Sequence, residues 1–98
     1  MNYTKDEVIE KAKKIITDLN PDALKYEKIH DVNFDEKEKL ARGENKGKNH
    51  PCWTVSILTI GDNVNFLIIS DKTGEPLYYQ NFNMAIFEIE KNLDGKYF

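Results

Sequence analysis

The sequence predicts an α+β fold in two layers: an N-terminal helix packed on a four-stranded antiparallel sheet, with a short C-terminal helix. Three observations lead to this prediction. Apolar residues recur at helical spacing in the first twenty residues, apolar runs separated by short turns fill the middle of the chain, and a helix-compatible segment follows them. Because short turns join antiparallel neighbours, the sheet should be a meander. The 98 residues suffice for one core, so we expect 1–98 to form a single domain.

The first predicted element is an amphipathic helix over residues 4–19. Thr4 and Glu7 have the spacing of a capping box, in which each side chain accepts a hydrogen bond from the other residue's backbone N–H. Apolar residues three and four positions apart form one stripe for burial: Val8, Ile9, Ala12, Ile15, Ile16 and Leu19. The helix should end at Asn20-Pro21, because a residue that precedes proline disfavours the helical conformation.

A half-buried strand is predicted over residues 24–34, either at an edge of the sheet or with a β-bulge near Ile29. Its apolar residues share one parity: Leu24, Tyr26, Val32 and Phe34. Lys28 and His30 interrupt this face, which is typical of an edge strand.

The segment 35–51, DEKEKLARGENKGKNHP, is expected to be a long flexible loop. Asp35 and Glu38 can cap one helical turn that runs through Leu40. The glycines that follow then interrupt regular structure.

Three further strands are predicted from short apolar runs: 52–60, 64–70 and 77–80. Gly61-Asp62-Asn63 and Asp71-Lys72-Thr73-Gly74 have the composition of the turns between them. Trp53, the sole tryptophan, is expected in the core beneath the N-terminal helix.

The segment 83–93, NMAIFEIEKNL, fits both helix spacing and strand spacing. Its alanine, glutamate, lysine and methionine favour the helix, and Asn83 can cap it. Asp94-Gly95 would end this C-terminal helix.

Composition narrows the classes of function. The formal net charge is −3, which disfavours a nucleic-acid binder and leaves room for a basic protein partner. One cysteine permits no internal disulfide. The first residues contain no apolar segment of a signal peptide, and no apolar run approaches the roughly 20 residues of a membrane span. We therefore expect a cytoplasmic protein that does not engage a membrane.

Catalytic and metal chemistry have little support in the sequence. His30, His50 and Cys52 offer at most three nitrogen or sulfur ligands, whereas a structural zinc site uses four. A nucleophile formed by Cys52 and a histidine lacks the local signature of such enzymes. The chain is therefore predicted to be non-enzymatic, without catalytic residues, bound metal or cofactor.

Partner binding has better candidates. Tyr78 and Tyr79 are adjacent in a strand and must point to opposite faces, so one of them should be exposed on the open face of the sheet. Acidic residues that would suit a basic partner are also predicted to contribute: Asp35, Glu36, Glu38 and Asp62.

A family resemblance adds to this reading. A lysine-rich helix followed by PCWTVSI, FLIISDKTGEPLYY and IFEIEKNL resembles the bacterial immunity proteins of polymorphic toxin systems, of the immunity protein 35 type. The layout is also similar to PepSY and cystatin-like modules, and the matching residues are Trp53, Asp71, Gly74 and Leu77. The first resemblance implies a protein that binds and neutralises a cognate toxin domain. The second implies a module that regulates a peptidase or binds a small ligand.

Overall fold

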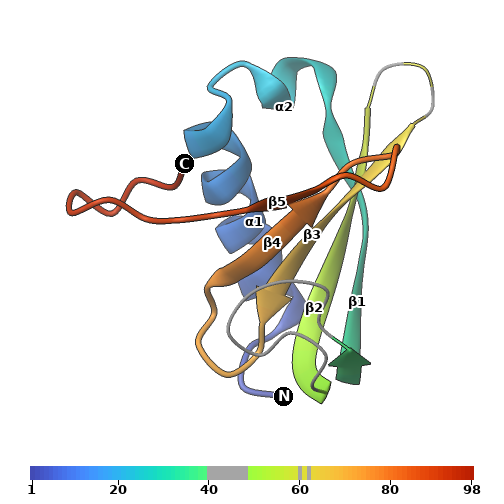
Figure 1. Ribbon diagram of the computed structural model, residues 1–98, viewed down its shortest axis with the longest axis vertical. Helices are drawn as coiled ribbons and strands as arrows, with labels where there is room; N and C mark the ends of the chain where they lie inside the picture. The colour runs from blue at the N-terminus through green and yellow to red at the C-terminus, as the bar shows by residue number, and fades with distance from the viewer. Residues whose placement is uncertain (40–48, 60, 62) are drawn as a thin grey trace.

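The computed structural model of the protein describes residues 1–39, 49–59, 61 and 63–98, and of residues 37–39 the backbone alone (Figure 1). Its elements follow in this order: α1 (Lys5–Leu19), α2 (Ala23–Tyr26), β1 (Lys28–Lys39), β2 (Asn49–Leu58), β3 (Val64–Ser70), β4 (Pro76–Gln80) and β5 (Ile86–Glu88). The strands form one antiparallel sheet in sequential order, and α1 packs on one face of it. The predicted α+β meander is confirmed, but the sheet has five strands where four were predicted.

The predicted N-terminal helix and its capping box are confirmed. The side chain of Thr4 accepts a hydrogen bond from the N–H of Glu7 at 3.2 Å, and the carboxylate of Glu7 accepts one from the N–H of Thr4 at 2.9 Å. The stripe places four residues in the core: Val8, Ala12, Ile15 and Ile16. The helix ends at Leu19, which is partly exposed.

The predicted strand over residues 24–34 is wrong at its start. The chain first turns at Asn20, whose side chain accepts a hydrogen bond from the N–H of Asp22, and then forms the single turn of α2. Leu24 and Tyr26 are consequently exposed instead of lying on the buried face of a strand. The predicted bulge is confirmed, because the β1–β2 register shifts just after Ile29.

The segment 35–51 is not a loop at its two ends, and the predicted helical turn from Asp35 does not form over 35–39. β1 continues through Lys39 and β2 begins at Asn49, so that these two residues pair across the ladder. An edge strand needs only one backbone ladder, and its polar side chains can face water. Residues 40–48 lie outside the described residues.

The predicted C-terminal helix is also wrong. The side chain of Asn81 accepts hydrogen bonds from the N–H groups of Asn83 and Ala85, at 2.9 Å each, and Met84 adopts a φ of 68°. This tight turn returns the chain alongside β4. There the chain forms β5, in which Phe87 pairs with Tyr79 of β4. Backbone groups that a helix would use are therefore satisfied in the sheet.

A second hairpin follows β5. Glu90 and Phe98 exchange two backbone hydrogen bonds of 3.0 Å, and Lys91 bridges to Tyr97. We call residues 90–98 the C-terminal hairpin. It projects from the body of the fold and then returns toward α1 (Figure 1).

The core lies between α1 and the sheet. Trp53 is 4% exposed and packs there against Phe34, with ring centroids 5.1 Å apart, as the sequence predicts. On the opposite face of the sheet lies a smaller cluster, which we call the outer cluster: Cys52, Ile68 and Tyr78. Within the described part of the chain, no helix has the length and apolarity needed to cross a membrane.

Candidate functional site

The segment that begins β2 is joined to the turn after β3 by buried side chains. His50 Nε2 lies 2.7 Å from Ser70 Oγ. Ser70 Oγ also accepts hydrogen bonds from the backbone N–H groups of Lys72 and Thr73. The Ser70 O–H is then left to donate to a neutral His50. Ser70 is 1% exposed and already holds the turn, so this pair is structural and offers no accessible nucleophile.

This contact predicts a pH dependence of stability. Burial, together with the nearby Lys72, lowers the pKa of His50 from its ordinary value near 6.5. As the pH falls below that value, the unfolded chain binds a proton that the folded protein does not, so the free energy of unfolding decreases. With one proton involved, the slope is at most about 1.4 kcal/mol per pH unit.

Urea denaturation between pH 8 and pH 5.5 measures this slope. A His50→Gln variant keeps a hydrogen-bond acceptor for Ser70 but cannot be protonated, so its stability should change less over the same range. Burial raises the pKa of Glu27, so its protonation makes the folded protein more stable as the pH falls, opposite to the effect of His50. Because Glu27 is present in both proteins, its contribution cancels in the comparison. If the free energy of unfolding changes equally with pH in the two proteins, the pH dependence does not come from His50.

Asp71 lies next to this pair and joins three parts of the chain. One carboxylate oxygen accepts a hydrogen bond from the Trp53 indole N–H at 2.9 Å. The backbone N–H groups of Asn2 and Tyr3 donate to the same carboxylate at 2.8 and 3.3 Å. Burial would raise the pKa of Asp71, but these hydrogen bonds hold it below its ordinary value. Asp71 therefore anchors the start of α1 to the sheet.

The sequence offers Cys52 as a candidate nucleophile and metal ligand. The thiol is fully buried, and His50 faces Ser70. Over the described residues, His, Cys, Asp and Glu side chains do not gather in groups of three that could hold a metal ion.

The two predicted partner-binding tyrosines lie on opposite faces of β4. Tyr79 is half-buried on the helix face, where its hydroxyl accepts a hydrogen bond from Asn65 at 2.8 Å. Tyr78 lies on the other face, but it is only 3% exposed, so the expectation of an exposed tyrosine there is wrong. Tyr78 belongs to the outer cluster, against which Phe66, Leu77 and Ile86 pack, and Ile86 comes from β5, the strand beside β4.

The predicted acidic residues lie elsewhere. Asp35 and Glu36 are exposed near the end of β1, which is separated from β4 by β2 and β3. The backbone of Glu38 pairs with His50, while its side chain lies outside the description. Asp62 is also outside the described residues. The structure therefore does not bring the acidic residues on β1 together with the tyrosines.

A different surface has the form of a binding site. A hollow of about 440 Å³ lies where α1 ends, bounded by α2, β5 and the end of the C-terminal hairpin. Its apolar lining comes from residues far apart in the sequence: Ile16, Leu19, Ala23, Tyr79, Phe87 and Phe98. A second hollow of about 410 Å³ adjoins it, shares Asn20, Ala23 and Glu27, and adds Tyr26 and Phe82. We call these two hollows the groove.

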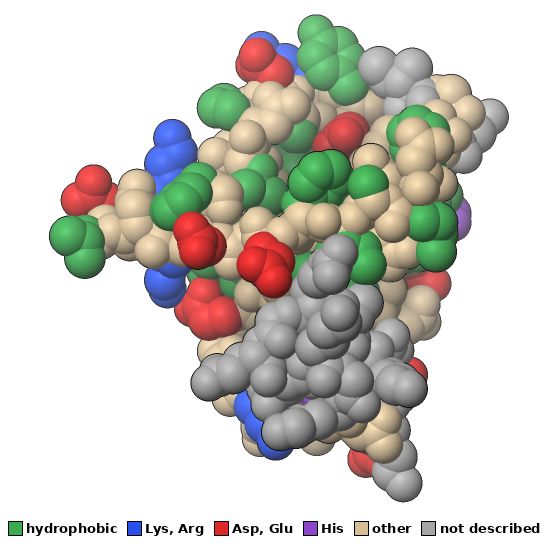
Figure 2. Space-filling view, in the orientation of Figure 1, with side chains coloured by type: hydrophobic (Ala, Val, Ile, Leu, Met, Phe, Trp, Pro, Cys, Tyr) green, Lys and Arg blue, Asp and Glu red, His purple; other side chains and the backbone are tan. Residues whose placement is uncertain are grey.

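Large apolar side chains around the groove remain exposed. Phe87 is 53% exposed and Phe98 is 59% exposed in the first hollow, and Tyr26 and Phe82 are more than half exposed in the second. In Figure 2, hydrophobic side chains gather over β5 and beside the helices, with acidic groups among them. Isolated exposed apolar residues are ordinary, whereas a gathering around one concave surface is typical of a binding site.

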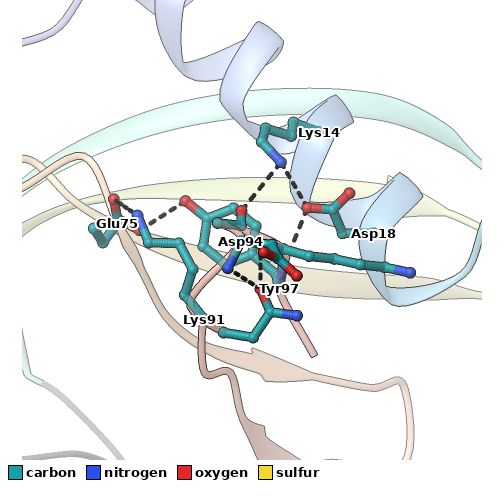
Figure 3. A network of polar contacts seen from close by, with 9 residues as sticks. Lys14, Asp18, Glu75, Lys91, Asp94 and Tyr97 are labelled. Carbon is teal, nitrogen blue, oxygen red and sulfur yellow. Dashed lines mark hydrogen bonds and ion pairs between the residues drawn. The ribbon is translucent and has the colours of Figure 1, made fainter.

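The C-terminal hairpin completes the groove because Tyr97 fixes it to the body of the fold (Figure 3). The N–H of Tyr97 donates to Asp18 on α1 at 3.2 Å, and its hydroxyl donates to Glu75 at 2.7 Å. Burial and the bond to Glu75 raise the pKa of this hydroxyl. Two lysine ammonium groups lie over the Tyr97 ring: Lys14 and Lys91. These contacts place the next residue, Phe98, in the lining of the groove.

Comparison with protein-family models, with curated proteins and with solved structures finds no match. The groove is therefore interpreted from its own chemistry.

Of the predicted partner-binding residues that the structure describes, Tyr79 lines the groove, but the rest of the lining was not predicted as a site. Leu19 was assigned to the buried stripe of the helix, and Phe87 fell in the segment that was predicted as a helix. Glu27 and Phe98 carried no motif. The available signal was an abundance of large apolar residues after position 80, more than a short terminal helix on a small sheet can bury.

Proposed function

We propose that the protein is a non-enzymatic, cytoplasmic immunity protein that binds a cognate toxin domain and neutralises it, with the groove at the centre of the contact. The observation that carries this proposal is the gathering of half-exposed aromatic side chains around one concave surface. Aromatic residues are enriched in protein interfaces and supply much of the binding energy. The resemblance to immunity proteins of polymorphic toxin systems agrees with this proposal.

The exposed aromatic residues favour the groove over the acidic end of β1 as the centre of the interface. A standard interface covers about 800 Å² on each partner. The whole molecule exposes 6209 Å². Asp35 and Glu36 lie on the edge strand opposite β5 and do not line the groove. The acidic residues then act chiefly through the charge of the surface, which attracts a basic partner during encounter.

Affinity capture tests the proposal. Tagged protein is used to capture partners from lysate of the native host, and the partner is identified by mass spectrometry. We expect one stoichiometric protein whose isolated domain inhibits growth when expressed alone and is harmless when it is co-expressed with this chain. The proposal fails if no such partner appears when the toxin is known to be expressed, or if the captured domain stays toxic in the presence of the chain.

Removing the aromatic lining should weaken the complex. A Phe87→Ser/Phe98→Ser double variant is expected to raise the Kd for the captured partner by about 30-fold or more, as loss of interface aromatics commonly does. Isothermal titration calorimetry measures this change. Leu93→Ser is the matched control, because Leu93 is fully exposed in the C-terminal hairpin and does not line the groove. Equal losses of affinity in the two proteins would show that the groove is not the contact.

A ligand-binding module, like the PepSY and cystatin-like modules, is the second candidate. The first hollow, of about 440 Å³, lies in the range of small-molecule sites. A small ligand that raises the melting temperature in proportion to its concentration would favour this function.

A further inference from the structure

We propose that the groove receives a lysine or arginine side chain of the partner, flanked by apolar residues, and that the carboxylate of Glu27 pairs with its cation. This inference rests on the proposed function for the identity of the partner. The chemistry of the site rests on the groove itself.

The backbone holds Glu27 in place between the two hollows. It follows directly after α2, and its N–H donates to the carbonyl of Ala23 at 2.7 Å. Its side chain is half-buried and belongs to the lining of both hollows. A cation that enters either hollow therefore meets this carboxylate at the junction.

Glu27 differs from every other carboxylate in a comparable position. Among the described residues, four acidic side chains are buried or half-buried: Asp18, Glu27, Asp71 and Glu75. Asp18 pairs with Lys14, Asp71 accepts the Trp53 indole N–H, and Glu75 pairs with Lys91. The carboxylate of Glu27 has no hydrogen-bond or ion-pair partner among the described residues. A partly desolvated carboxylate gains when a donor from outside the chain supplies this missing contact.

The other charged residues of the lining favour a cationic hydrogen-bond donor. The charged residues that line the two hollows, within the described part of the chain, are Glu27 and Glu88, and both are acidic. The nearby Lys25 pairs with Asp22 at 3.3 Å, and Lys28 is exposed. Within these two hollows an anionic occupant would meet charged side chains of like sign only, whereas a cation meets charge of the opposite sign. Lys25 and Lys28 line a separate hollow of about 290 Å³, which shares Tyr26 and Glu27.

The aromatic residues favour a cation that carries apolar neighbours. The methylene stem of a lysine or arginine can pack along the apolar wall while its charged end reaches a carboxylate. Exposed rings such as Tyr26 and Phe87 offer faces for cation–π contact and for the flanking apolar residues. The occupant is thus a basic residue within an apolar segment of a protein, which agrees with the net charge of −3.

Two small probes test the chemistry of the site without the partner. Phenylethylammonium carries an aromatic ring and a cation, and 2-phenylethanol has the same ring without the charge. Titration followed by amide NMR shifts should show that the ammonium probe binds at the groove, with shifts at Glu27, Tyr79 and Phe87, at least about five-fold more tightly than the alcohol.

Glu27→Gln should abolish this preference for the cation, whereas Glu36→Gln, an exposed substitution on β1, should preserve it. Melting temperature checks the fold of each variant, and Glu27→Gln should not lower it, because it removes a partly desolvated carboxylate that has no partner among the described residues. Equal affinity of the two probes, no binding of the ammonium probe at 50 mM, or an unchanged preference in Glu27→Gln would overturn the inference.

The captured partner then separates this inference from the proposed function. We expect Glu27→Gln to raise the Kd for the partner about ten-fold and Glu36→Gln to leave it within two-fold. If the Phe87→Ser/Phe98→Ser variant weakens the complex and Glu27→Gln does not, the immunity function stands and the cation contact fails. If the ammonium probe binds through Glu27 and no toxin is captured, the cation site stands and the immunity function fails.

Discussion

Replacing Asp71 with alanine is expected to lower the free energy of unfolding by about 3 kcal/mol, because it removes the acceptor of three N–H donors. The largest loss is expected at the indole N–H of Trp53, because Trp53 is 4% exposed and this donor would be left buried without its acceptor. The N–H groups of Asn2 and Tyr3 lose the same partner, so the start of α1 is released from the sheet. Urea denaturation followed by tryptophan fluorescence measures the loss.

A double-mutant cycle isolates the contact between Trp53 and Asp71. Trp53→Phe removes the indole donor and keeps an aromatic ring, so Asp71→Ala should cost less in that background than in the original protein. A coupling energy near zero would contradict the role assigned to this hydrogen bond. Because hydrogen bonds hold the pKa of Asp71 below its ordinary value, its contribution should be complete at neutral pH. It should disappear as the pH falls below about 4.

Gly74→Ala is expected to destabilise the protein by about 2–3 kcal/mol. Gly74 has a φ of 73°, and a Cβ atom there would lie 2.7 Å from the Tyr3 ring. The substitution therefore combines the strain of a left-handed conformation with displacement of a ring that packs against the core. It would also disturb the contact of that ring with Lys11.

Gly95→Ala provides the matched control for Gly74. Gly95 has a φ of 81°, but a Cβ atom there would have no neighbour within 4 Å. Only the backbone strain applies, so the expected loss is about 1 kcal/mol. Thermal or urea denaturation of the two variants compares the losses directly. If both variants lose the same stability, packing of Tyr3 on this turn contributes nothing measurable.

Local signals in the sequence predicted the parts of the fold that local interactions determine. The capping box of Thr4 and Glu7 and the apolar stripe after it define α1 before any tertiary contact is considered. The central strands could be predicted for the same reason: each is a short apolar run between turn residues. Trp53 could be placed in the core because its strand alternates with the right parity.

The errors occur where pairing with a neighbouring strand decides the structure. The first residues of 83–93 have no preference strong enough to exclude either a helix or a strand, and the ladder with β4 selects the strand. The charged end of β1 contains nothing apolar to mark it, and it is extended because β2 lies beside it. Propensity alone cannot reveal which strand a segment will pair with.

The groove could not be predicted for a related reason. Its lining comes from α1, α2, β4, β5 and the last residue of the chain, so it depends on how all these elements meet. Tyr78 and Tyr79 were predicted to bind because tyrosine is common at interfaces, and the acidic residues because they would suit a basic partner. The sequence could not show that Tyr78 is covered, or that Glu27 is a half-buried carboxylate with no hydrogen-bond or ion-pair partner among the described residues.

Growth rescue tests the central claim most directly, namely that the protein neutralises a toxin domain by binding it through the groove. The captured partner's domain is co-expressed with the original protein, with Leu93→Ser or with Phe87→Ser/Phe98→Ser, and growth is compared at matched levels of folded protein. The original protein and Leu93→Ser should restore growth, and the groove variant should not. Full rescue by the groove variant, or no rescue by the original protein, would contradict the claim.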